Sequence, residues 1–79
     1  LGKKKFAYTI VTRGPKLGYA LRNQNWRYAK WPDGEELYKL NSDPEEKLNL
    51  AGKIHLNKRL MEFRQILAAK QIEAASKRQ

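Results

Sequence analysis

The sequence predicts an α+β fold, in which a four-stranded antiparallel sheet carries one C-terminal amphipathic helix packed across it. Two observations predict this fold. Residues 6–40 contain four short segments rich in β-branched and aromatic residues, and turn-forming residues separate these segments. Residues 54–75 instead carry apolar residues at every third or fourth position, as an amphipathic helix does. A chain of 79 residues has room for a single domain.

The first two strands lie on either side of a Gly-Pro break. Residues 6–12 alternate in the manner of a strand, with apolar side chains expected on both faces. Gly14-Pro15 interrupts the pattern, and residues 18–22 resume it as a short second strand. Arg13 and Lys16 are therefore expected on a loop between the two strands.

The third and fourth strands form a predicted hairpin. Residues 26–31 follow an asparagine-rich turn and alternate aromatic with basic side chains. Pro32-Asp33-Gly34 is typical of a tight turn, with a positive φ expected at Gly34. Residues 35–40 then complete the meander.

The segment after the sheet changes from strand to helix. Asp43 can cap one helical turn within residues 43–50, Pro44 suits its first position, and Glu46 can bond back to the cap. The long helix is predicted over about residues 54–75. Its apolar stripe should cover one face of the sheet. The stripe consists of Leu56, Leu60, Phe63 and Leu67.

The second face of the sheet is expected to remain uncovered by this chain. Its apolar and aromatic side chains would then form either a binding surface or an interface with a larger protein. A piece that folds with such a face exposed could also associate with itself.

Composition excludes several classes of protein. The chain has no cysteine, so it holds neither a disulfide nor a thiolate metal site. The charge is +9, from 17 Lys and Arg against eight Asp and Glu. This balance is compatible with a nucleic-acid-binding module, but six acids within residues 32–46 interrupt any continuous basic track. A smaller anion, such as a sulfated or carboxylated sugar, suits the charge equally well.

The residues provide no recognisable catalytic set. His55 is the only histidine, and a surface or capping position explains it better than a metal site. The acids Asp43, Glu45 and Glu46 are spaced for helix capping rather than for metal binding.

Two groups of residues could bind a ligand. Arg13 and Lys16 flank the Gly-Pro break, and they are either substrate-binding residues or parts of a solvated basic turn. The aromatic residues of the third strand either stack on bases or sugars or pack inside the protein, and packing is favoured. These aromatic residues are Trp26, Tyr28 and Trp31.

One series of motifs resembles a known family. These motifs are Leu21-Arg22-Asn23-Gln24-Asn25-Trp26-Arg27-Tyr28, Trp31-Pro32-Asp33-Gly34, Glu36-Leu37-Tyr38-Lys39-Leu40-Asn41-Ser42-Asp43-Pro44-Glu45-Glu46 and Asn49-Leu50-Ala51. They resemble the C-terminal subdomain of formylglycine-dependent sulfatases of the arylsulfatase family. Residues 11–19 are similar to the iduronate sulfatase-like branch. Lys39 and Asn23 depart from the usual family residues, and this weakens the assignment to a branch.

The resemblance implies that this chain is the C-terminal fragment of a sulfatase and is inactive alone. The parent would hydrolyse sulfate esters of sugars or glycosaminoglycans, with formylglycine and calcium held in an N-terminal catalytic domain. None of the motifs for these groups lies in the 79 residues. The resemblance therefore assigns this chain no catalytic or metal-binding residue. It also implies that the catalytic domain is the partner, in a parent that is periplasmic, secreted or lysosomal.

The same resemblance gives Arg13 and Lys16 a role. In the family the first loop of this subdomain can reach the mouth of the active-site pocket, where these residues would contact a sugar carboxylate or sulfate. Since the first residue is Leu rather than Met, we also expect the chain to be cut from a longer one. An independent nucleic-acid-binding module is the alternative function, and a protein-interaction domain is a third.

Overall fold

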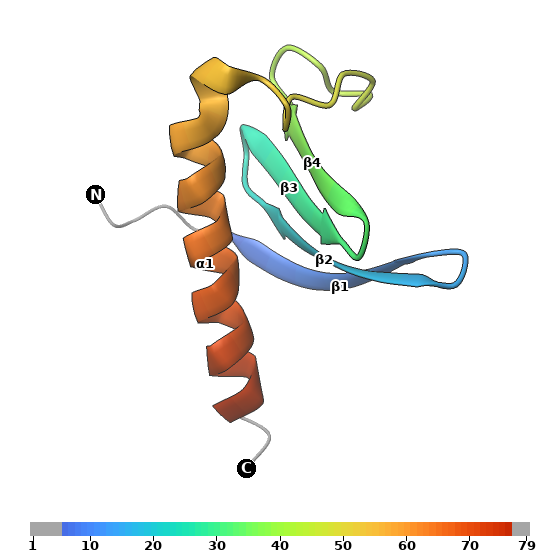
Figure 1. Cartoon of the computed structure of the whole chain (residues 1–79), viewed down its shortest axis with the longest axis vertical. Coiled ribbons are helices and arrows are strands. Elements are labelled where there is room, and N and C mark those ends of the chain that lie inside the picture. Colours follow the sequence, from blue (N-terminus) through green and yellow to red (C-terminus); the bar gives the residue numbers. More distant parts are fainter. Residues whose placement is uncertain (1–5, 77–79) are drawn as a thin grey trace.

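Four strands pair in chain order to form one antiparallel sheet, and a long helix crosses one of its faces (Figure 1). The computed structural model describes residues 6–76, so the basic residues Lys3, Lys4 and Lys5 lie outside the described part. The predicted α+β fold is confirmed. The elements are β1 (Ala7–Arg13), β2 (Lys16–Arg22), β3 (Trp26–Trp31), β4 (Gly34–Lys39), the 3-10 turn η1 (Ile54–Leu56) and α1 (Asn57–Ser76).

The main core lies between α1 and the sheet. Leu21, Tyr28 and Leu37 stand opposite one another on adjacent strands, and all three are fully buried. The helix covers them with most of its predicted apolar stripe. The buried helix residues are Leu60, Phe63 and Leu67, whereas Leu56, at the end of η1, is half-buried.

Phe63 is the centre of this core. Its ring meets Phe6 edge-on at 5.4 Å and stacks on Tyr28 at 5.9 Å, measured between ring centroids. Trp26 adds a tilted contact at 6.0 Å. Offset and edge-on aromatic pairs of this kind are attractive beyond the area they bury. A single helical residue thus contacts both Phe6, which directly precedes β1, and residues of β3.

A buried tyrosine adds a polar link between helix and sheet. The Tyr28 hydroxyl donates to Glu35 Oε2 at 2.7 Å, and Arg64 donates two hydrogen bonds of 2.6 Å to the same carboxylate. The hydrogen bonds from Arg64 hold the pKa of Glu35 below its ordinary value. Burial raises the pKa of Tyr28, so its hydroxyl stays a donor at neutral pH. Arg64 lies on α1 and Glu35 on β4, so the link fixes the helix across the sheet.

The first hairpin is longer than the sequence predicts. β2 begins at Lys16, and the turn consists only of Gly14 and Pro15. Gly14 has a φ of +61°, which closes a two-residue turn and lets both strands continue up to it. The prediction of a positive φ at Gly34 was wrong, because among residues 6–76 Gly14 is the only glycine with a positive φ.

The connection from sheet to helix is a turn rather than the single helical turn that was predicted. Glu46 N–H donates to the Asp43 carbonyl at 3.0 Å, and Glu46 has a left-handed φ of 58°. The Asp43 carboxylate accepts hydrogen bonds from the Lys47 and Leu48 amides at 3.0 and 2.9 Å, and these bonds lower its pKa. Asp43 therefore acts as a cap, but the left-handed residue prevents a helical turn from continuing.

The second face of the sheet is largely closed by its own side chains. Trp31 is only 7% exposed and packs against Ala20 and Ala29. Its ring also lies against Gly18, where an added Cβ would come within 2.6 Å of the indole. Within the described residues no helix covers this face, as expected, but Trp31 is not exposed on it, because small residues on β2 and β3 leave room for the indole to lie flat on the sheet.

Within residues 6–76, no helix combines the length and the apolar character needed to cross a membrane.

Candidate anion-recognition site at the hairpin tip

The two predicted substrate-binding residues lie at the tip of the β1–β2 hairpin. Arg13 ends β1, Lys16 begins β2, and the two face each other in the strand register. In Figure 1 this hairpin extends away from α1, so its tip lies far from the main core. The structure thus brings the two residues together on strand ends, whereas the sequence placed them on a loop.

Arg13 is held in place by contacts from two directions. Its guanidinium donates to both carboxylate oxygens of Glu36, at 2.7 and 3.2 Å, and its Cζ lies 4.4 Å from the centroid of the Trp31 ring. The hydrogen bonds raise the pKa of Arg13 and lower that of Glu36. A guanidinium oriented in this way presents a planar fork that suits a carboxylate or a sulfate.

Lys16 also has an acidic partner. Its Nζ donates to Asp33 Oδ2 at 2.6 Å, and this bond lowers the pKa of Asp33. The Lys16 and Asp33 side chains are 47% and 63% exposed, so water screens the pair.

The two ion pairs at the tip differ in how exposed they are. Exposed ion pairs contribute only about 0–1 kcal/mol, so an anion could replace Asp33 beside Lys16 at little cost. Glu36 is only 17% exposed and bonds to Arg13 through both oxygens, so it is held more firmly. The sequence identified the two cations, because their type and position are local features. It missed their acidic partners, which lie 17 and 23 residues further along the chain.

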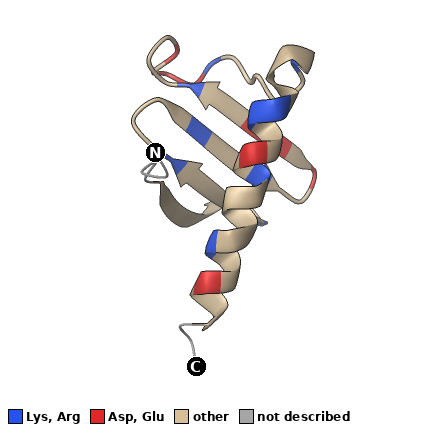
Figure 2. Ribbon diagram, turned by 90° about the vertical axis from the view of Figure 1, so that its left-hand side faces the viewer, with Lys and Arg blue, Asp and Glu red and all other residues tan. Residues whose placement is uncertain are grey.

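The aromatic residues of β3 are used for packing. Tyr28 is fully buried, Trp31 is 7% exposed, and Trp26 lies between Phe63 and the Arg59 guanidinium, which is 4.8 Å from its ring. No pair of these rings forms an open platform on which bases could stack. Within residues 6–76, Figure 2 shows acidic and basic residues interspersed over the sheet and the helix. Both findings argue against the nucleic-acid alternative.

A second group of cations serves the fold. Glu46 accepts a hydrogen bond from Arg27 at 3.2 Å and lies 3.7 Å from Arg22. Glu46 belongs to the connection after β4. The contacts tie that connection to β2 and β3.

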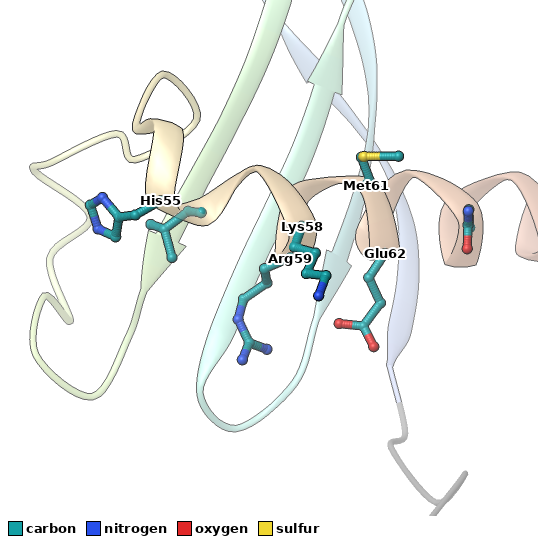
Figure 3. A pocket seen from close by; sticks show the side chains of 7 residues that line it. His55, Lys58, Arg59, Met61 and Glu62 are labelled. Atoms are coloured by element: carbon teal, nitrogen blue, oxygen red, sulfur yellow. The ribbon is translucent and has the colours of Figure 1, made fainter.

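The start of α1 carries a shallow pocket with exposed polar side chains (Figure 3). His55 is exposed there, and Figure 3 shows it apart from Lys58 and Glu62. Across residues 6–76, no three His, Asp or Glu side chains come together in a group that could hold a metal ion. The pocket therefore lacks the ligands of a metal centre.

Comparison with known proteins gives similarity to solved structures only. No family model and no curated protein matches the chain. A protein from Bacteroides thetaiotaomicron assigned as a sulfatase matches with a TM-score of 0.74 and 28% identity. A 2-O GAG sulfatase matches with a TM-score of 0.74 and 27% identity. Each match covers 92% of this chain but only 18% of the other. The chain is thus similar, over nearly its whole length, to about a fifth of a sulfatase.

Proposed function

We propose that this chain is the C-terminal subdomain of a sulfatase, in which it completes the fold and contributes a basic hairpin tip to the substrate pocket. The match to two sulfatase structures over 92% of the chain carries this proposal. Since the chain accounts for only 18% of those proteins, sulfate ester hydrolysis would belong to the larger protein.

The catalytic groups would lie outside this chain. Formylglycine derived from cysteine cannot form here, because the chain has no cysteine. Calcium prefers several carboxylate oxygens at one site, and residues 6–76 offer no such group. We therefore propose that both groups belong to an N-terminal catalytic domain, which is the partner of this subdomain.

The hairpin tip would act on substrate binding. Arg13 and Lys16 are exposed, close together and oriented by carboxylates, and these features suit recognition of a sulfated or carboxylated sugar. Such contacts position a substrate rather than cleave a bond. Sulfated sugars or glycosaminoglycans are the proposed substrate class, as one of the two similar structures is a 2-O GAG sulfatase.

Steady-state kinetics of the complete protein test the proposal. The double variant Arg13→Ala/Lys16→Ala should raise KM for an acidic sugar sulfate by about tenfold or more, since each lost charge-assisted contact costs about 1.5–3 kcal/mol. Arg22→Ala is the matched control, because it removes a cation remote from the tip. Absence of sulfate ester hydrolysis by the complete protein would refute the sulfatase assignment. Equal effects on a small neutral aryl sulfate would refute the role of the tip.

A further inference from the structure

The two edge strands of the sheet differ in whether another segment hydrogen-bonds to their outward-facing backbone groups. At the β4 edge, the Asn49 side chain accepts from the Leu37 amide at 2.9 Å and donates to the Glu35 carbonyl at 3.1 Å. The Leu50 amide adds a bond of 2.8 Å to the Leu37 carbonyl. At the β1 edge, no residue within 6–76 makes a comparable backbone contact. Among the described residues, one edge is covered and the other is left open.

The strand register shows which backbone groups the open edge presents. Arg13 and Lys16 flank a two-residue turn, so they form a hydrogen-bonded pair, and the pairs of β1 alternate from there. Thr12, Ile10 and Tyr8 therefore fall in non-hydrogen-bonded pairs. Their N–H and C=O groups point away from β2. Each of the three residues offers one donor and one acceptor to an incoming strand.

The side chains along this edge are also suited to pairing. Residues 7–12 contain no charged residue and no proline, and these are residues with which proteins usually protect an exposed edge. Ile10 is 49% exposed, and Leu17, on the same face of the hairpin, is 47% exposed. An exposed apolar face thus lies directly beside the unpaired backbone groups.

We propose that the open edge of β1 pairs with an extended strand of the catalytic domain. This proposal rests on the proposed function and names the surface through which the subdomain docks. The matched sulfatases are more than five times longer than the matched segment, so most of the protein available for pairing lies outside this chain. A second copy is a poorer occupant, because two chains of charge +9 repel each other. The incoming strand would be rich in uncharged β-branched residues, and it would fix the hairpin tip beside the pocket.

Amide hydrogen exchange of the 79-residue chain tests the register. The Thr9 and Val11 amides should exchange slowly, because they bond to β2, whereas those of Tyr8, Ile10 and Thr12 should exchange fast. If protection of the Tyr8, Ile10 and Thr12 amides rose with protein concentration, another copy would occupy the edge, and the proposal would be overturned.

The same measurement on the complete protein tests the occupant. Exchange at Tyr8, Ile10 and Thr12 should slow by on the order of 100-fold relative to the 79-residue chain. Fast exchange there, with Thr9 and Val11 still protected, would overturn the proposal. Protection at the edge in a protein that hydrolyses no sulfate ester would refute the proposed function and leave the pairing intact.

A pair of proline variants separates docking from folding. Thr12→Pro removes an amide that points outward, so the 79-residue chain should fold as before while the complete protein loses protection at Ile10 and Tyr8. Val11→Pro removes an amide bonded to β2 and should destabilise both forms. Retained edge protection in complete Thr12→Pro would count against pairing.

Discussion

Gly18→Ala is the substitution for which the structure gives the sharpest prediction. Gly18 lies in β2 beneath the indole of Trp31, which in turn contacts Arg13 of the hairpin tip. Its φ is outside the left-handed region, so the backbone itself accepts alanine. Without a steric conflict the change would stabilise the chain by about 0.4–1 kcal/mol, because alanine restricts the unfolded state. Any measured loss of stability is therefore attributable to the contact with Trp31.

The expected loss follows from three distances. A Cβ on Gly18 would lie 2.6, 2.8 and 2.9 Å from Cε3, Cζ3 and Cδ2 of Trp31. Carbon atoms in favourable contact are about 3.5–4.0 Å apart, so the ring has to move by about 1 Å. Trp31 is only 7% exposed and has little free space in which to move. Overpacking of this kind costs about 1–3 kcal/mol.

Thermal unfolding followed by circular dichroism measures this loss. For a domain of this size Tm should fall by roughly 4–8 °C for each kcal/mol. Gly34→Ala is the matched control, because its added Cβ would meet no atom within 4 Å, and its Tm should be unchanged or slightly higher. If Gly18→Ala left Tm unchanged, or if both variants lost the same amount, the close packing of Trp31 on Gly18 would be refuted.

Three further predictions concern the core, the helix link and the hairpin turn. Phe63→Ala should cost about 3–5 kcal/mol, and far-UV circular dichroism at 25 °C should show a large unfolded fraction. Glu35→Gln should cost about 1 kcal/mol in urea unfolding, since it loses the charge-assisted bonds from Arg64 but keeps an acceptor for Tyr28. The lowered pKa of Glu35 stabilises the fold fully above its ordinary value of 4.5, and this stability is lost as the pH falls through the lower folded-state pKa. Urea midpoints between pH 6 and pH 2 should therefore decline less in Glu35→Gln, and an equal decline would contradict this reasoning. Gly14→Ala should cost about 1–2 kcal/mol, because alanine is strained at a φ of +61°, and an unchanged Tm would contradict the turn geometry.

The elements could be predicted because their signals are local. Alternation marked the strands, and the three- and four-residue spacing marked the helix, including its buried residues Leu60, Phe63 and Leu67. The conformations of the turns were harder to predict than the strands and the helix. The sequence favoured a positive φ at Gly34, whereas the structure has it at Gly14. Both hairpins close with two turn residues, but Gly14 lies within its turn and Gly34 is already the first residue of β4.

The candidate site could be predicted only in part. Arg13 and Lys16 were identifiable from residue type and from their position beside a turn, and their proposed role in substrate binding stays a prediction. Their pairing with Glu36 and Asp33 was not identifiable, because these acids belong to the other hairpin. Which ends of two hairpins approach each other depends on how the sheet twists and pairs.

The sequence by itself determined the fold class, the order of strands and helix, and the apolar stripe of α1, because short-range periodicity and turn residues specify these features. Only the tertiary structure decided which face of the sheet is closed, which charges are neutralised and which edge is open. Trp31 can lie flat because Gly18 and Ala20 come from a neighbouring strand. Asn49 covers the edge of β4 because the connection folds back on it. Such contacts join residues distant in sequence, and they arise from the packing of the whole chain.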